Sequence, residues 1–120
     1  VKVVELDFSE TGASASDVVN IAKVNAGTLV EKVDYRIKTA EGGTATADVG
    51  DGDDPNGYDD AIDLNAAANT VGGTLPVVAT DAFAKGKYYA ADDTIDLTLD
   101  HTLDTAVVVF YIHYITDAFA

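Results

Sequence analysis

The run Val107–Ile115, VVVFYIHYI, is the feature that most limits what this chain can fold into. Every residue in it except one histidine is apolar or aromatic, so apolar and polar side chains do not alternate. Because successive side chains of a strand point to opposite faces, a strand here presents an apolar row on each face. A β-sandwich has one inner face per sheet, so its own core covers only one of the two rows.

The second apolar row of this strand therefore needs a cover, which is either an overlying loop or a neighbouring subunit. Its tyrosine and histidine suit a subunit interface better than a dry core, so we predict self-association through this face. Two tyrosines of the segment GKYYAA are assigned to the same interface, although core tyrosines are equally ordinary in sandwiches. The predicted interface comprises Tyr88, Tyr89, Val107, Val109, Tyr111, His113 and Ile115.

Most of the remaining sequence alternates with the period of two that is typical of strands. In 30–50, two alternating segments flank the turn signal Glu41-Gly42-Gly43, which predicts a β-hairpin. The segment 59–69 is the only plausible helix, and a short strand or an irregular loop suits it equally well. Further strands are predicted at 2–8, 17–24, 76–80, 86–91, 94–100 and 105–115.

Short strands at regular, turn-punctuated intervals indicate an all-β fold. We predict an antiparallel β-sandwich with a jelly-roll-like arrangement. Residues 1–120 are expected to form a single domain, in which 1–16 is an extended arm or an edge strand.

Composition narrows the classes of partner. The 120 residues are 48% hydrophobic, which favours a packed core, and carry 21 acidic against 7 basic side chains, a net charge of −14. This charge disfavours nucleic acid and anionic membrane surfaces. The apolar run near residue 110 is well short of the ~20 residues of a membrane helix. The chain has no cysteine, so disulfides and cysteine-based zinc sites are excluded.

The segment 48–60, DVGDGDDPNGYDD, concentrates oxygen-bearing side chains on a glycine-rich loop. Hard cations such as calcium bind several such oxygens, but the spacing does not follow the EF-hand pattern. The same composition is typical of a solvated turn, and both interpretations stay open. The candidate calcium ligands are Asp51, Asp53, Asp54, Asn56 and Asp59.

Nothing else in the sequence predicts catalysis. Neighbouring carboxylates are expected by chance in so acidic a chain, and no Ser/His/Asp order, phosphate loop or HExxH motif is present. His101 is expected to be exposed in a turn. His113 is expected to be a packed or interface residue, with a pH-sensitive contact as the alternative. We therefore predict no enzyme activity and no cofactor apart from a possible calcium ion.

Several stretches resemble small structural proteins of tailed-phage virions. These are AKVNAGTLVEKVDYRIKTAEGGTATADVGDGDDPNGY, then AADDTIDLTL and the apolar strand, which together cover roughly residues 20–115. The chain departs from the pattern at Asn25, where similar chains often have proline. The resemblance implies a β-sandwich or jelly-roll subunit, commonly a trimer, mounted on a capsid or another virion surface. It assigns no functional residues.

We therefore predict a non-enzymatic virion protein located on the capsid surface. Its expected role is capsid decoration or cement, as a homotrimer bound to the major capsid protein or another virion protein. One alternative is a calcium-dependent carbohydrate-binding or tail-fibre-type module that uses the 48–60 loop. The other is a self-polymerising fibre subunit, in which residues 2–8 complement the sheet of a neighbour.

Overall fold

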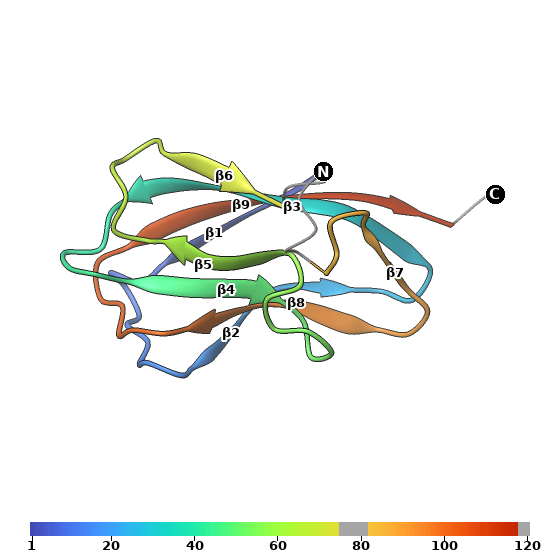
Figure 1. Cartoon of the computed structure of the whole chain (residues 1–120), viewed down its shortest axis with the longest axis horizontal. Helices are drawn as coiled ribbons and strands as arrows, with labels where there is room; N and C mark the ends of the chain where they lie inside the picture. The colour runs from blue at the N-terminus through green and yellow to red at the C-terminus, as the bar shows by residue number, and fades with distance from the viewer. Residues whose placement is uncertain (75–81, 118–120) are drawn as a thin grey trace.

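The computed structural model describes residues 1–74 and 82–117, which form two antiparallel β-sheets packed as two layers (Figure 1). No helix occurs in these residues, and so none that could span a membrane. The strand predicted at 76–80 lies outside the described residues. The strands are β1 (Lys2–Asp7), β2 (Val18–Val24), β3 (Thr28–Thr39), β4 (Thr46–Gly50), β5 (Asp59–Asp63), β6 (Val71–Gly73), β7 (Lys87–Tyr89), β8 (Asp93–Leu99) and β9 (Val107–Thr116).

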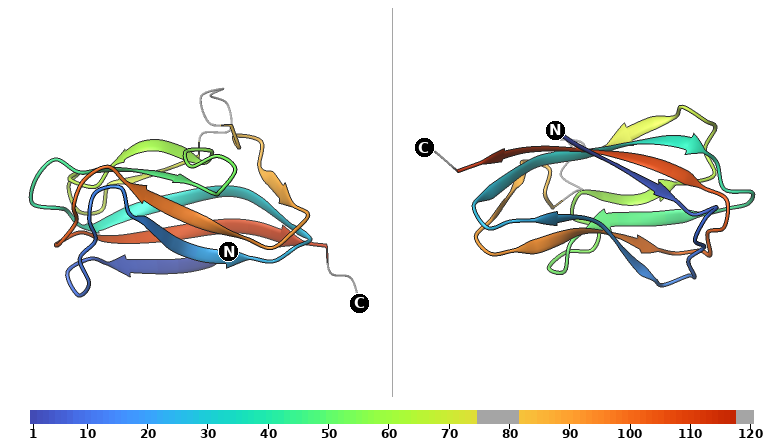
Figure 2. Two further views of the ribbon diagram at one scale, coloured as in Figure 1. Left: turned by 90° about the horizontal axis from the view of Figure 1, so that it is seen from below. Right: turned by 180° about the vertical axis from the view of Figure 1, so that it is seen from behind.

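The strand order confirms the predicted sandwich. Sheet 1 has the order β1-β9-β3-β6, with β7 also paired to β3, and sheet 2 has the order β2-β8-β4-β5. The pairs are nested: β1 with β9, β2 with β8, β3 with β6 and β4 with β5. This nested order is compatible with the predicted jelly roll, in which a long antiparallel ribbon is rolled into two layers. The two layers lie one above the other in the right-hand view of Figure 2.

The prediction of a hairpin over 30–50 is wrong. β3 belongs to sheet 1, whereas β4 belongs to sheet 2, where it pairs with β8 and β5. Residues 40–45 therefore carry the chain from one layer to the other. An alternating pattern and a glycine turn are compatible with either connection. The burial of Glu41 and Ala45, which are 8% and 0% exposed, favours the crossing between layers.

β9 lies between β1 and β3 in the interior of sheet 1. Its inner row, Val108, Phe110 and Ile112, is buried between the layers. The facing residues of sheet 2 come from β8, where Ile95, Leu97 and Leu99 are buried as the alternating pattern predicts. Tyr114 continues the inner row but remains 41% exposed.

The segment 59–69 begins with a short strand, which was one of the alternatives to a helix. β5 covers Asp59–Asp63 and pairs with β4, and turns follow it. Ala61 has a left-handed backbone with φ of 53°, and its N–H donates to Asp48 Oδ1 over 2.9 Å. This distortion lies beside a register shift in the β4–β5 pair. Residues 1–16 were expected to form either an extended arm or an edge strand. β1, which lies within them, is an edge strand of sheet 1.

Glu41 fastens the crossing segment to the loop before β9. Its Oε1 accepts hydrogen bonds from the backbone N–H groups of Asp104, Thr105 and Ala106, over 3.0, 3.0 and 3.1 Å. Burial alone would raise the pKa of this carboxyl, but the hydrogen bonds outweigh burial and lower the pKa to about 2. The ionised carboxylate therefore stabilises the folded state.

We predict that Glu41→Gln destabilises the protein by up to about 3 kcal/mol at pH 7, since one pKa unit corresponds to about 1.4 kcal/mol. Because the folded pKa lies below the ordinary value of 4.5, the contribution is complete above pH 4.5 and is lost as pH falls toward 2. Urea unfolding of both proteins between pH 7 and pH 2.5 measures the difference. Glu31→Gln, at an exposed position of β3, is the control. A pH-independent loss would contradict the assignment.

Candidate functional site

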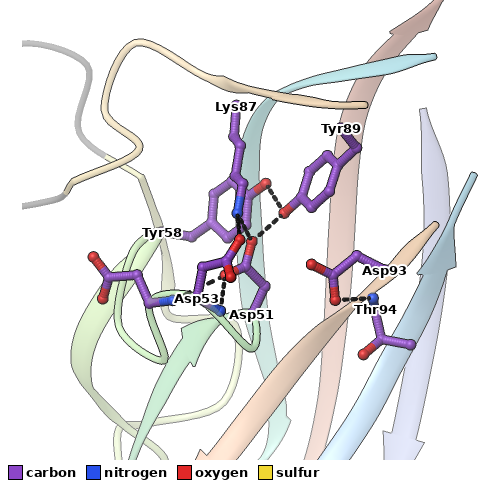
Figure 3. Close-up of polar contacts among 8 residues, drawn as sticks. Asp51, Asp53, Tyr58, Lys87, Tyr89, Asp93 and Thr94 are labelled. Carbon is purple, nitrogen blue, oxygen red and sulfur yellow. Dashed lines mark hydrogen bonds and ion pairs between the residues drawn. The ribbon is translucent and has the colours of Figure 1, made fainter. Parts of the chain in front are cut away.

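The best-formed polar cluster of the described residues surrounds Asp51, in the loop after β4 (Figure 3). Asp51 directly follows β4, Tyr58 directly precedes β5, and Lys87 and Tyr89 belong to β7. Asp93 is the first residue of β8. The loop after β4 and the start of β8, both from sheet 2, thus meet strand β7 of sheet 1 around Asp51.

The Asp51 carboxylate accepts four hydrogen bonds from protein groups, and its side chain is fully buried. Oδ1 accepts the backbone N–H groups of Asp53 and Asp54, each over 3.0 Å. Oδ2 accepts Lys87 Nζ over 2.5 Å and Tyr89 Oη over 2.8 Å. Burial would raise the pKa of Asp51, but the hydrogen bonds from Lys87 and Tyr89 outweigh burial and lower it.

Lys87 is held between two carboxylates and two aromatic rings. Its Nζ also contacts Asp53 Oδ2 over 3.0 Å, and lies 4.6 Å and 4.9 Å from the ring centroids of Phe83 and Tyr89. Burial would lower the pKa of this amine, but the hydrogen bonds to Asp51 and Asp53 raise it. The cluster is therefore an internal ion pair under an aromatic cover.

Two tyrosines extend the cluster into the core. The hydroxyls of Tyr58 and Tyr89 share a hydrogen bond of 2.7 Å, and Phe83 packs edge-on against Tyr58 with 5.0 Å between the ring centroids. Burial is the largest cause that raises the pKa of both phenols, so both stay neutral. As neutral phenols, Tyr89 donates to Asp51 and Tyr58 donates to Tyr89.

Two glycines allow the loop to close over this site. A side chain at Gly50 would place its Cβ 2.1 Å from the carbonyl oxygen of Asp54, and one at Gly57 would place it 2.2 Å from the ring of Phe83. The backbone also holds the turn, because the N–H groups of Asp51 and Gly57 both donate to the Asp54 carbonyl. The glycines read in the sequence as turn signals are thus required by close approach.

The structure brings together two of the five candidate calcium ligands. Ligand oxygens of Asp51, Asp53 and Asp93 lie within 4.8 Å of one another, and Asp93 was not among the predicted residues. Asp54 takes part in the loop through its backbone. Asp59 is not a member of this group, and Asn56 is exposed. The Lys87 amine already offsets one of the two negative charges of the carboxylates that it contacts.

Calcium binding by this loop stays a prediction. If it occurs, millimolar calcium raises the melting temperature relative to chelator, because a ligand that binds only the folded state stabilises it by mass action. Differential scanning fluorimetry with calcium and with EDTA measures the shift. An unchanged melting temperature leaves only the turn interpretation.

The predicted interface residues divide into two groups. Tyr89 is a correction: it is 3% exposed and belongs to the core, because its hydroxyl reaches Asp51 and Tyr58. Val109 is also buried, at 5% exposure, between its register partners Glu5 and Arg36. Tyr88 and Ile115 are 51% and 56% exposed. Val107, Tyr111 and His113 are partly exposed.

Charged side chains of sheet 1 cover part of the outer row of β9, which consists of Val107, Val109, Tyr111, His113 and Ile115. Arg36 Nε donates to Tyr111 Oη over 3.2 Å, and Lys38 pairs with Glu5 over 2.9 Å. His113 Nε2 and Lys32 Nζ lie 3.1 Å and 3.3 Å from Asp34 Oδ2. The middle of the row is thus roofed by this chain's own side chains, whereas Ile115 is open.

A shallow hollow crosses the same face of sheet 1. Val1 and Val71 stand on its rim, 71% and 70% exposed, and Tyr111 and His113 lie between them. The glycines of β6 contribute to the hollow because they carry no side chain. A Cβ at Gly73 would lie 2.1 Å from Asp34 Oδ1.

Sequence reasoning missed Lys87, Glu41 and Asp93, which organise the polar contacts. A buried lysine gives no signal in a chain where alternation predicts an exposed position. His101, expected to be exposed, is partly buried, and its Nδ1 accepts the N–H of Thr46 over 3.2 Å.

We predict that Lys87→Met lowers the free energy of unfolding by about 3 kcal/mol, because it leaves the buried carboxylate of Asp51 without its countercharge. Thermal or urea unfolding at pH 7 measures the loss. Lys85→Met is the matched control, since Lys85 is exposed two residues away. Equal effects of the two substitutions would show that the ion pair contributes nothing specific.

Comparisons with known proteins show which solved structures share the fold of this chain. No family model and no curated protein matches this chain. Among solved structures, a chain of the capsid of Ralstonia phage GP4 superposes with a TM-score of 0.68, covering 98% of this chain and 84% of its own. A chain of the acidic stable capsid of Helicobacter pylori bacteriophage KHP30 gives 0.62, with 94% and 89% covered.

A third chain, from the capsid asymmetric unit of cyanophage Pam1, gives a TM-score of 0.60 and covers 92% of this chain and 81% of its own. Each of the three is 14% identical in sequence. At that identity the likeness concerns the fold. This chain therefore shares, over nearly its whole length, the fold of chains found in phage capsid structures.

Proposed function

We propose that the protein is a structural, non-enzymatic component of a phage virion, located in the capsid. The observation that carries this proposal is the superposition of nearly the whole chain on chains of three phage capsid structures. The polar cluster supports it too: the carboxylate of Asp51 is engaged by four protein donors, which leaves no acceptor position free for a substrate.

Within this role, we assign the protein to capsid decoration or cement, assembled as a homotrimer through the outer face of sheet 1. Directly opposed residues of neighbouring strands share a face. The register therefore places Val71 beside Arg36 and Val109, and Val3 beside Tyr111. A third row joins Ile115, Leu29 and Tyr88. Exposed apolar side chains are thus spread along the whole face.

The two faces of the sandwich differ in charge. On sheet 1 the outer charges are paired, as in Lys38 with Glu5 and Lys32 with Asp34. On sheet 2, Asp48 lies near Asp60 and Asp100; burial is the main cause that raises its pKa, and these two carboxylates raise it further. A second copy of a chain with net charge −14 meets less repulsion at sheet 1.

The fibre alternative has less support. It requires residues 2–8 to pair with a neighbour, whereas β1 pairs with β9 of its own chain along its whole length. We therefore propose assembly through a face instead of exchange of this strand.

Two valines provide a matched test of the proposed face. Val3 and Val18 are both 59% exposed and lie in the edge strands of sheet 1 and sheet 2. We predict that Val3→Asp converts a trimer into monomers, because it places a charge beside Tyr111, and that Val18→Asp leaves the trimer intact. Size-exclusion chromatography with multi-angle light scattering measures the mass, and circular dichroism confirms that both variants fold.

A wild-type protein that is monomeric at micromolar concentration would contradict the proposed homotrimer. Assembly of Val3→Asp and Tyr111→Asp to the same mass as Val18→Asp would show that another surface forms the interface. The virion role itself is tested separately by an image reconstruction of the native particle, in which this sandwich should occupy density on the shell. A particle without it would contradict the proposal.

A further inference from the structure

The contacts of Lys87 and Asp51 go beyond those of an ordinary ion pair. We propose that the two side chains condense into an intramolecular isopeptide bond, which joins Nζ of Lys87 to Cγ of Asp51 and releases water. The structure describes the pair before this bond forms. The inference does not depend on a role in the virion.

The first requirement is proximity. Lys87 Nζ lies 2.5 Å from Asp51 Oδ2, and the carboxyl carbon is only one bond of about 1.2 Å further on. Two reacting groups held at this range react as if present at very high effective concentration. The lysine is fixed in place by Asp53 and by the ring of Phe83, so its amine cannot move away freely.

The second requirement is stabilisation of the tetrahedral intermediate. When the amine attacks, negative charge develops on the oxygen that is not expelled, Asp51 Oδ1. That oxygen already accepts the backbone N–H groups of Asp53 and Asp54, each over 3.0 Å. Paired backbone donors of this kind form an oxyanion hole.

The third requirement is a path for protons. The amine, as NH₃⁺, must lose two protons to become an amide N–H, and Asp51 Oδ2 must gain two to leave as water. Asp53 Oδ2, 3.0 Å from Nζ, is placed to accept a proton from the amine. One proton passes directly from Nζ to Oδ2 along the hydrogen bond that joins them, and Asp53 returns the other to Oδ2. Tyr89, which donates to Oδ2 over 2.8 Å, holds the leaving oxygen in place and keeps its own proton. The C–N bond replaces the C–O bond, and no proton or electron is gained or lost overall.

The surroundings favour the product over the separated charges. The Asp51 side chain is fully buried and that of Lys87 is 18% exposed. Burial is the largest single influence on the pKa of both groups and opposes the charged form of each, but their hydrogen bonds outweigh it, so both are charged before the reaction. An amide carries no charge to bury, and water has little access to reverse the reaction. The bond would fasten β7 to the loop after β4 in a chain that has no cysteine for a disulfide.

Intact-mass spectrometry of the purified full chain decides the matter. We expect the protein, after incubation at neutral pH, to be lighter than its sequence by the mass of one water molecule. Proteolysis should yield one branched peptide that contains Asp51 and Lys87. Lys87→Arg, which keeps the charge but lacks the amine, should have the full mass, and Lys85→Arg should retain the loss of water.

Asp53→Asn should slow the reaction about a hundredfold, as expected when a general base is removed. The mass difference, followed over time in freshly refolded protein, measures this rate. A wild-type protein of full mass after prolonged incubation would overturn the proposal, as would a loss of water that maps to another pair. Neither result would bear on the trimer or the virion role.

Discussion

The pairing of β9 with both β1 and β3 is the constraint on which the rest of the fold depends. The β3–β9 ladder runs from Thr28 opposite Thr116 to Thr39 opposite Val107, and it is the longest in the molecule as described. Through it the inner row of β9 is placed over sheet 2, and β6 and β7 are placed against β3. Because β9 is central, its lack of alternation is no anomaly. One row fills the core, and the middle of the other lies under the charged side chains of its neighbours, with Ile115 left exposed.

Three buried carboxylates have different surroundings, and two of them are stabilised by hydrogen bonds. Glu41 is held mainly by backbone N–H groups, and Asp51 by backbone groups together with a lysine and a tyrosine. Asp96 is 8% exposed, and its Oδ1 has no hydrogen-bond partner among the described residues. Burial raises the pKa of Asp96, so its ionisation opposes folding as pH rises, the reverse of Glu41. The acid response of the protein is thus a balance between these groups.

The sequence allowed the sandwich and most of its strands to be predicted, because alternation reports which residues face a core. It misplaced the partner of β4, since a local pattern does not distinguish a hairpin from a crossing between sheets. Tyr89 was assigned to a surface for a related reason: nothing near it in the sequence shows that Asp51 and Tyr58 lie opposite its hydroxyl. The polar cluster joins residues 51, 58, 87 and 93, and such long-range convergence follows from the topology alone. The family resemblance indicated the fold class that the capsid structures share.

The nested strand order also sets conditions on how the molecule acquires its structure. β1 has no partner in its sheet until residues 107–112, about a hundred positions later, can reach it. Ladders that join such distant segments form slowly, because the connecting chain must first lose its freedom. During synthesis, β3 would therefore lack its partner β9 until the end of the chain has been made. Mutual repulsion between its many aspartates is then a means of keeping unfinished copies apart until the closing strand arrives.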